Sequence, residues 1–251
     1  MKSVFKITMV STLLATLVGC ADMYTKDGTP NDPWESVNRK VFVVNDTLDH
    51  YALKPAAEGY TAVTPTPIRE GVGNFFGNLG EVGNFTNGIF QGNPLIAGTS
   101  LTRLLINTTL GLGGILDPAT SLGIERRSED FGKTFAAWGA KSGPFIMLPL
   151  LGPSTLRDTA GKPLDWQLDP VREIDNNYQY WGLRFLNLVN VRSGFLEQEK
   201  LMQGDRYTLL RDAWMQTRQF EIHGPQAGDP FATGNFDYDE LPASKDAPAK
   251  Q

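Results

Sequence analysis

The chain has 251 residues, of which 23 are basic and 28 acidic, and its formal net charge is −5. An acidic chain without basic runs is not typical of proteins that bind nucleic acid or anionic membrane surfaces. A single cysteine excludes an internal disulfide, and two distant histidines do not supply the clustered ligands of a zinc site.

The N-terminus has the order of a secretory signal. Lys2 and Lys6 precede an apolar stretch over residues 7–18, which is too short to span a bilayer. Cys20 follows two positions after the end of this stretch. We therefore predict a signal peptide over residues 1–19. Leu-Val-Gly before Cys20 resembles the lipobox of bacterial lipoproteins, which predicts Cys20 as the lipidation site. The alternative is an ordinary signal peptide with a coincidental cysteine.

Residues 20–31 are predicted to be a lipidated polar tether, and residues 32–222 a helical domain. Asn, Asp or Thr precedes Pro at the expected helix starts Asp32-Pro33, Thr66-Pro67, Asn93-Pro94 and Asp169-Pro170, and Ser128 precedes two acidic residues. Apolar residues then recur every three or four positions, as in Trp34, Val37, Val41, Val44, Leu48 and Tyr51. Residues 223–251 are rich in Gly, Pro, Ala and Asp, which predicts a disordered tail.

Two stretches have unusual composition. Residues 71–90 mix Gly, Asn and Phe, and Gly73 and Gly77 would let another helix approach closely. A helix of this kind and a Gly-rich loop with core aromatics are equally compatible with the composition. Residues 139–152 combine Gly143-Pro144 and Pro149 with apolar residues. Prolines oppose a regular helix there, so the stretch is either a buried extended crossing or an interfacial wedge.

Few residues suggest catalysis. The chain lacks the Gly-x-Ser-x-Gly turn of serine hydrolases and complete dinucleotide or phosphate-loop motifs. The acidic pairs Glu129/Asp130 and Asp237/Asp239 leave a carboxylate-dependent cell-wall hydrolase as the surviving enzymatic hypothesis, although a helix start and a solvated tail account for them. We predict a non-enzymatic protein without a metal or other cofactor.

Several strings occur in an order that resembles the MlaA (VacJ) family of outer-membrane lipoproteins. They are Asn31-Asp-Pro-Trp-Glu-Ser-Val-Asn-Arg39, Asn74-Phe-Phe-Gly-Asn-Leu79, Thr102-Arg-Leu-Leu-Ile-Asn-Thr-Thr-Leu-Gly-Leu-Gly-Gly-Ile-Leu-Asp117, Glu129-Asp-Phe-Gly-Lys-Thr134, Gly143-Pro-Phe-Ile-Met-Leu-Pro149, Gly152-Pro-Ser-Thr-Leu-Arg-Asp158 and Tyr207-Thr-Leu-Leu-Arg-Asp-Ala-Trp214. Each string alone is weak, but their ordered combination over residues 31–223 is specific.

The resemblance implies an all-α fold, in which amphipathic helices lie in the membrane interface as a ring around a central polar channel. It implies a lipoprotein on the periplasmic side of the outer membrane that removes mislocalised phospholipid from the outer leaflet. The expected partners are phospholipid, a porin trimer and a periplasmic lipid carrier. A porin-associated scaffold without transport activity is the structural alternative.

Three sets of residues are candidates for this function. Polar residues among apolar neighbours are candidates for the channel lining: Asn38, Asn45, Asn74, Asn78, Asn107 and Thr108. Apolar residues are candidates for lipid contact: Phe75, Phe76, Leu95, Ile96, Leu101, Leu104 and Leu105. A mobile gating loop is predicted at Gly139, Gly143, Pro144, Phe145, Pro149 and Gly152. The alternatives are capping or core hydrogen bonds for the polar residues and core packing for the apolar ones.

Overall fold

The structure is a computed structural model that describes residues 22–25, 27–200 and 202–224. The predicted signal peptide, Cys20 and residues 225–251 of the predicted tail lie outside the described residues. His223, where the tail was expected to begin, is the last residue of a helix.

The described chain is mainly helical. In order, its elements are α2 (Glu35–Leu48), the π-helical η1 (Asp49–Leu53), α3 (Lys54–Val63), α4 (Thr66–Phe90), α5 (Pro94–Thr109), α6 (Pro118–Ser121), α7 (Phe131–Ala137), β1 (Phe145–Leu148), β2 (Gly152–Thr155), α8 (Leu156–Asp165), the 3₁₀-helical η2 (Pro170–Glu173), α9 (Asn177–Ser193), α10 (Leu196–Glu199) and α11 (Arg206–His223).

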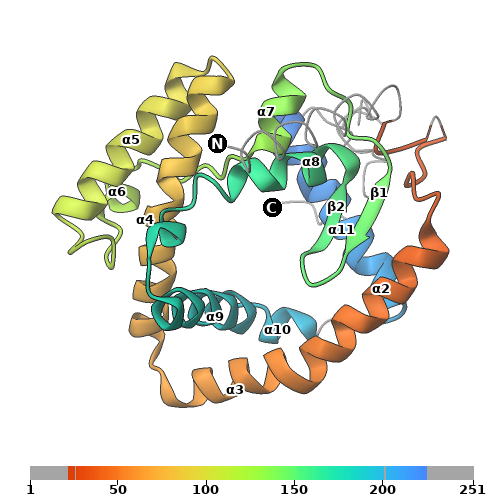
Figure 1. Ribbon diagram of the computed structural model, residues 1–251, viewed down its shortest axis with the longest axis horizontal. Coiled ribbons are helices and arrows are strands. Elements are labelled where there is room, and N and C mark those ends of the chain that lie inside the picture. The colour runs from red at the N-terminus through yellow and green to blue at the C-terminus, as the bar shows by residue number, and fades with distance from the viewer. Residues whose placement is uncertain (1–21, 26, 201, 225–251) are drawn as a thin grey trace, which may run out of the picture.

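These elements form a ring (Figure 1). α2, η1 and α3 follow one edge, α4 forms the opposite wall with α5 packed along its outer side, and α9 packs against both α3 and α4. α7 and α8 pack together and close the ring between α4 and the antiparallel pair β1–β2. The ring predicted from the family resemblance is therefore confirmed.

The helix starts agree only partly with the predicted caps. Asn93 caps α5 by accepting a hydrogen bond from the Ile96 amide at 3.2 Å. Asp130, rather than Ser128, caps α7 through the Lys133 amide at 2.8 Å. Asp32 does not cap α2, because its carboxylate accepts hydrogen bonds from Asn38 and from the Tyr207 hydroxyl instead.

The Gly-rich stretch lies within the single helix α4, which decides between its two interpretations. A Cβ on Gly88 would lie 2.6 Å from the Ala97 backbone nitrogen, so the missing side chain at Gly88 lets the backbone of α5 approach α4 closely. Gly77 has another role, since a Cβ there would meet the Arg126 guanidinium at 2.5 Å. Close packing thus explains glycine at positions 77 and 88, whereas Gly83 of the same helix has open space around it.

The principal core lies beneath the β1–β2 hairpin. It comprises Met23, Phe145, Met147, Tyr207 and Met215. Met23 is only 3% exposed, and the Phe145 amide donates a hydrogen bond to the Asn31 carbonyl at 2.8 Å. The prediction that residues 20–31 form a polar tether is therefore wrong for the described residues 22–25 and 27–31, because a buried methionine and a backbone hydrogen bond fix this segment to the hairpin.

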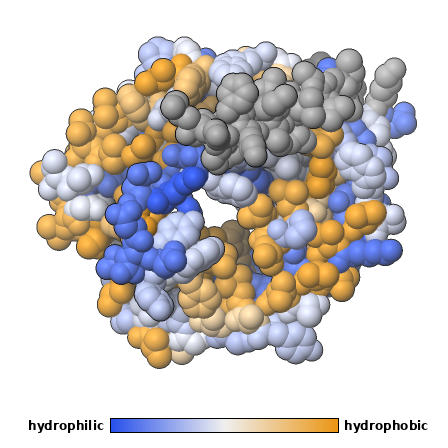
Figure 2. Space-filling view, in the orientation of Figure 1, coloured by the Kyte–Doolittle hydropathy of each residue, from blue (hydrophilic) through white to orange (hydrophobic). Residues whose placement is uncertain are grey.

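Apolar side chains are also abundant on the surface. The stripe predicted along α2 is exposed at Val37, Val44 and Leu48, and Leu95, Leu101 and Leu105 are exposed on α5. Figure 2 shows hydrophobic residues gathered along the outer edge of the ring over α5 and α6. Among the described residues, no helix combines the length and the apolar character needed to cross a membrane. The apolar faces of these helices are therefore available for contacts outside the chain.

Candidate functional site

An opening passes through the centre of the ring and has two unlike borders (Figure 2). Hydrophilic side chains gather along one border, over the segment that joins α8 to α9. Hydrophobic side chains gather on the opposite border, where the turn between β1 and β2 projects into the ring. The opening is consequently amphipathic, with polar side chains on only one of the two borders of the predicted polar channel.

Asn45 of α2 fixes the turn of the hairpin. Its Nδ2 donates a hydrogen bond to the Leu148 carbonyl, and its Oδ1 accepts one from the Leu150 amide, both at 2.9 Å. Leu150 has a φ of 62°, in the region that favours glycine, and its side chain is exposed. A non-glycine residue is strained in this conformation, so these two hydrogen bonds help to keep the turn in its present shape.

Asn38 fixes the base of the same hairpin. Its Oδ1 accepts a hydrogen bond from the Met147 amide at 2.9 Å, and its Nδ2 donates to Asp32 at 2.8 Å and more weakly to the Phe145 carbonyl. Asn38 and Asn45 lie two helical turns apart on α2, so one face of that helix holds both ends of β1.

Most of the predicted channel-lining residues have other roles. Asn38, Asn78 and Asn107 are buried, so the prediction that they line the channel is corrected. Asn78 donates a hydrogen bond to Thr108 at 2.9 Å, and Asn107 accepts one from the Ala119 amide at 3.1 Å, which ties α5 to its neighbours. The capping and core hydrogen bonds that were the alternative interpretation account for these three residues.

The remaining three polar candidates keep some accessible surface. Thr108 is exposed, while Asn45 and Asn74 are half-buried. Asn74 donates a hydrogen bond to the Ile115 carbonyl at 3.1 Å. These residues stay candidates for the channel, although Asn45 is already engaged by the hairpin turn.

The predicted lipid-facing residues also divide into two groups. Leu95, Leu101 and Leu105 are exposed on α5, as lipid contact requires, whereas Phe75, Phe76 and Leu104 are half-buried. Ile96 is only 7% exposed and packs towards Gly88 of α4, so its prediction as a lipid-facing residue is corrected. It lies between α4 and α5, where the absence of a side chain at Gly88 leaves room for it.

The predicted gating loop forms the hairpin and its approach. Gly143 and Pro144 are buried and Phe145 is fully buried in the core, so the base of this segment is anchored rather than mobile. Gly139 and Gly152 have φ angles of 89° and 77° and open space around their Cα atoms. Gly139 and Lys141 in the approach are exposed, and within the hairpin itself the exposed residues are Pro149, Leu150 and Leu151 of the turn.

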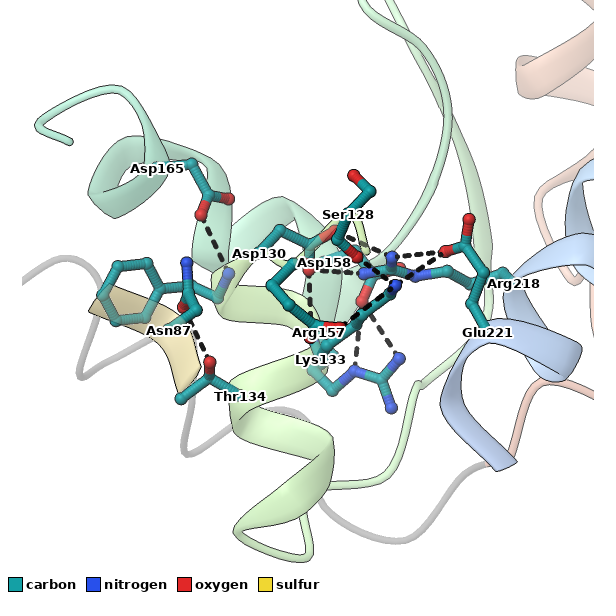
Figure 3. Close-up of polar contacts among 12 residues, drawn as sticks. Asn87, Ser128, Asp130, Lys133, Thr134, Arg157, Asp158, Asp165, Arg218 and Glu221 are labelled. Carbon is teal, nitrogen blue, oxygen red and sulfur yellow. Dashed lines mark hydrogen bonds and ion pairs between the residues drawn. The ribbon is translucent and has the colours of Figure 1, made fainter. Parts of the chain in front are cut away.

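A largely buried charged cluster joins α8 and α11 to the N-terminal end of α7 (Figure 3). Arg218 donates two hydrogen bonds to Asp130, both at 2.7 Å, and one to Asp158 at 2.8 Å. Burial alone would raise the pKa of Asp130, but the hydrogen bonds and charge of Arg218 outweigh it and hold that pKa below its ordinary value. This cluster is fully paired and keeps α11 against the other two helices.

A cavity of about 340 Å³ lies beside this cluster, between α4, the end of α8, η2 and α9. Its charged lining residues are Glu129, Asp130, Lys162, Asp165, Asp169 and Arg184. Asp169 and Arg184 form an ion pair at 2.6 Å. The Glu129 carboxylate accepts a hydrogen bond from Gln91 at 2.9 Å.

Asp165 is the least compensated of these carboxyls. One oxygen accepts a hydrogen bond from the Phe131 amide at 2.8 Å, as the dashed line in Figure 3 marks. Burial, with a further contribution from the Asp130 carboxylate, raises the pKa of Asp165 to about 7, although the Phe131 amide and the charges of Lys162 and Arg218 lower it. Perturbed carboxyls of this kind occur preferentially at functional sites.

A second cavity, of about 310 Å³, lies beside the hairpin, between β1, α2, α10 and α11. Phe42, Met147, Phe195, Met202 and Leu210 give it a mainly apolar lining from α2, β1, α11 and the neighbourhood of α10. Arg192 at its edge donates two hydrogen bonds to Asp49, at 2.7 and 2.8 Å. The hairpin therefore has free apolar space next to it.

The charged cavity as a whole was not predicted from the sequence. Lys162 and Asp165 are three residues apart and so share a face of α8, but the other charged residues come from three separate segments. Two local signals were present: the spacing of Lys162 and Asp165, and the acidic pair Glu129/Asp130, which was considered above as a catalytic pair. Over the part of the chain that the structure describes, no group of three or more His, Cys, Asp or Glu residues is placed to hold a metal ion.

Comparisons with known proteins agree on one family. The intermembrane phospholipid transport system lipoproteins MlaA of Shigella flexneri and Escherichia coli K12 are each 34% identical over 214 residues, which cover 83% of this chain and 85% of theirs. The protein of the same name from Haemophilus influenzae is 32% identical over 233 residues, covering 86% and 90%.

A solved structure described as "Structural basis for maintenance of bacterial outer membrane lipid asymmetry" superposes with a TM-score of 0.66 at 31% identity, covering 76% of this chain and 98% of that one. The family model described as MlaA lipoprotein matches residues 30–221. The chain therefore belongs to the MlaA lipoprotein family.

Proposed function

We propose that this chain is an outer-membrane lipoprotein that removes mislocalised phospholipid from the outer leaflet through its central opening and passes it to a periplasmic carrier. In this way it would maintain the lipid asymmetry of the outer membrane. The observation that carries the proposal is the opening itself, with a hydrophilic border opposite an apolar one, inside a ring whose helices expose apolar faces.

Such an opening suits the chemistry of a phospholipid. A charged headgroup that crosses hydrocarbon loses its hydration at a high free-energy cost, and polar side chains along its path reduce that cost. Acyl tails need no such path, because they can follow the apolar border or remain in lipid. No covalent bond has to break, so transport of this kind requires no catalytic residues.

The relatives support the same role, since three of them are named as components of an intermembrane phospholipid transport system. Acylation of Cys20 would anchor the chain on the periplasmic side of the outer membrane, and Met23, which follows three positions later, is packed in the core beneath the hairpin. A multiply acylated residue this close to the core would hold the ring at the membrane surface. The exposed faces of α2 and α5 would contact lipid or a porin trimer.

The β1–β2 hairpin is the gate in this proposal. Its turn projects into the ring, its base is buried, and an apolar cavity lies beside it. Release of the Asn45 hydrogen bonds would free Leu150 and Leu151 to move without unpacking Phe145. Movement of this turn would alter the apolar border of the opening.

Deletion and complementation in the native bacterium test the function. The deletion should raise the amount of phospholipid in the outer leaflet, and the wild-type chain should restore it. Cys20→Ser should behave like the deletion if acylation is required. A scaffold without transport activity predicts instead that the purified chain binds no phospholipid and transfers none to a carrier, and that result would refute the proposal.

A further inference from the structure

The charged cavity between α4, α8, η2 and α9 lies in the wall of the ring, on the side where hydrophilic residues border the opening. Its volume of about 340 Å³ falls within the range of small-ligand sites, about 300 to 1,000 Å³. Both signs of charge occur in it, and most of its charged groups are already paired within the chain. Lys162 and Asp165 are the two that remain available.

Asp165 has one carboxylate oxygen to spare. The Phe131 amide occupies Oδ1, and within the described residues no donor reaches Oδ2, although that atom is not sealed from solvent. Asp130 faces the same region but is committed to Arg218. A carboxylate in this position is stabilised by a cation that enters from the cavity.

Lys162 offers the complementary charge. Within the described parts of the chain it forms no hydrogen bond and no ion pair within 4 Å, and its influence on Asp165 is only electrostatic. The two residues lie three positions apart on α8, so they share a helix face and are separated by about 4.5 Å along the axis. Two side chains at that spacing can bind two linked groups of opposite charge in one ligand.

We propose that this cavity binds the zwitterionic headgroup of an aminophospholipid, with Asp165 accepting hydrogen bonds from the ammonium and Lys162 pairing with the phosphate. The inference rests on the proposed function, because it names the lipid that the opening would carry. A primary ammonium carries N–H groups that can donate hydrogen bonds to Asp165 Oδ2, which has no donor within the described residues. A trimethylated amine has none, and a glycerol headgroup has no positive charge.

The wild-type chain alone provides the first test. Full-length protein in detergent would be incubated with mixed micelles that contain equal amounts of phosphatidylethanolamine, phosphatidylcholine and phosphatidylglycerol. It would then be repurified, and its bound lipid would be counted by mass spectrometry. Because a hydrogen bond to a charged group contributes about 1.5 to 3 kcal/mol, phosphatidylethanolamine should be enriched about tenfold or more over the other two. Equal retention of the three lipids would overturn the headgroup site.

Two variants locate the preference. Asp165→Asn keeps an acceptor for the Phe131 amide but removes the negative charge, so the enrichment of phosphatidylethanolamine should fall to near unity. Lys162→Gln should weaken binding of all three lipids, since each has a phosphate. The exposed controls Asp175→Asn and Lys40→Gln should change neither quantity.

The outcomes separate the two proposals. In one outcome, the wild type binds phospholipid and a folded Asp165→Asn variant keeps the same headgroup preference. That result would overturn the headgroup site but would not contradict the transport function. A wild-type chain that binds no phospholipid would refute the transport function and the headgroup site together. If Asp165→Asn does not fold, the three-lipid comparison in the wild type and the Lys162→Gln variant still decide the matter.

Discussion

Replacement of Asn45 by alanine should loosen the turn of the β1–β2 hairpin without unfolding the ring. The substitution removes both 2.9 Å hydrogen bonds that join α2 to Leu148 and Leu150. A typical intramolecular hydrogen bond contributes about 0.5 to 1.5 kcal/mol, so their loss should favour opening of the turn by about 1 to 3 kcal/mol. The open population of the turn should then increase about 5- to 150-fold.

Amide hydrogen exchange measures this change at a single atom. The Leu150 amide is bonded directly to Asn45 Oδ1, so its exchange should accelerate by that factor in Asn45→Ala. The Met147 amide is bonded to Asn38 instead, so it should keep its wild-type rate and report that the base of the hairpin is intact. Asn38→Ala is the matched variant, in which Met147 exchange should accelerate. Unchanged exchange at Leu150 in Asn45→Ala would refute the assignment of Asn45 as the residue that holds the turn.

Three further predictions concern stability. Asp165→Asn should raise the free energy of unfolding by about 1 to 4 kcal/mol near pH 8 and change it little near pH 4. The reason is that the raised pKa of the Asp165 carboxyl makes the folded chain lose stability as pH rises between those values. Equal effects at both pH values in thermal melts would contradict this. Arg218→Met leaves the half-buried Asp130 without its ion-pair partner and leaves the buried Asp158 with Arg157 alone. It should cost about 3 to 5 kcal/mol in denaturant unfolding, whereas a loss under about 1 kcal/mol would argue that the cluster contributes little. Gly88→Ala should destabilise the folded chain by about 1 to 3 kcal/mol, because the added methyl group would contact α5. Gly83 has open space around it, so Gly83→Ala should stabilise the folded chain by about 0.5 to 1 kcal/mol. Effects of the same sign for both substitutions would contradict the packing described.

Much of the fold could be predicted from local sequence patterns. Three- and four-residue spacing identified α2, and Asn93-Pro94 located the start of α5. A periodic apolar face does not reveal what covers it, and the stripe along α2 proves to be largely exposed. Asp32 failed as a cap because Asn38 and Tyr207, from α2 and α11, compete for its carboxylate. Such competition depends on tertiary contacts that no local pattern contains.

The site was less predictable than the fold. A polar residue among apolar neighbours can line a channel or satisfy a nearby backbone group, and the sequence does not distinguish the two. Asn38 and Asn107 are of the second kind, because each bonds a backbone amide from another element. The charged cavity was not predicted because α4, the segment before α7, α8, η2 and α9 each contribute only part of its lining. Three-dimensional proximity, rather than composition, brings Lys162 and Asp165 next to Arg184.

The cost of Asp165 to stability accords with a binding role. A half-buried carboxyl without a full set of partners destabilises the chain at neutral pH, and nothing in the packing of α8 requires it to be charged. Functional sites commonly retain groups of this kind at the expense of stability. Asp130, which is fully paired with Arg218, shows how the same environment accommodates a carboxylate that is structural.

The central claim, that phospholipid passes through the opening, is tested most directly by obstructing it. Leu150→Cys places a thiol on the hairpin turn, and Tyr51→Cys places one on η1, the segment between α2 and α3. The native side chains are 76% and 78% exposed, so both thiols should react with a bulky maleimide. The only native cysteine, Cys20, is predicted to be consumed by acylation. Transfer of fluorescent phospholipid from vesicles that carry each modified chain to a periplasmic carrier is then measured. Modification at position 150 should abolish most of the transfer and modification at position 51 should leave it intact, whereas equal transfer by both modified chains would contradict a path through the ring.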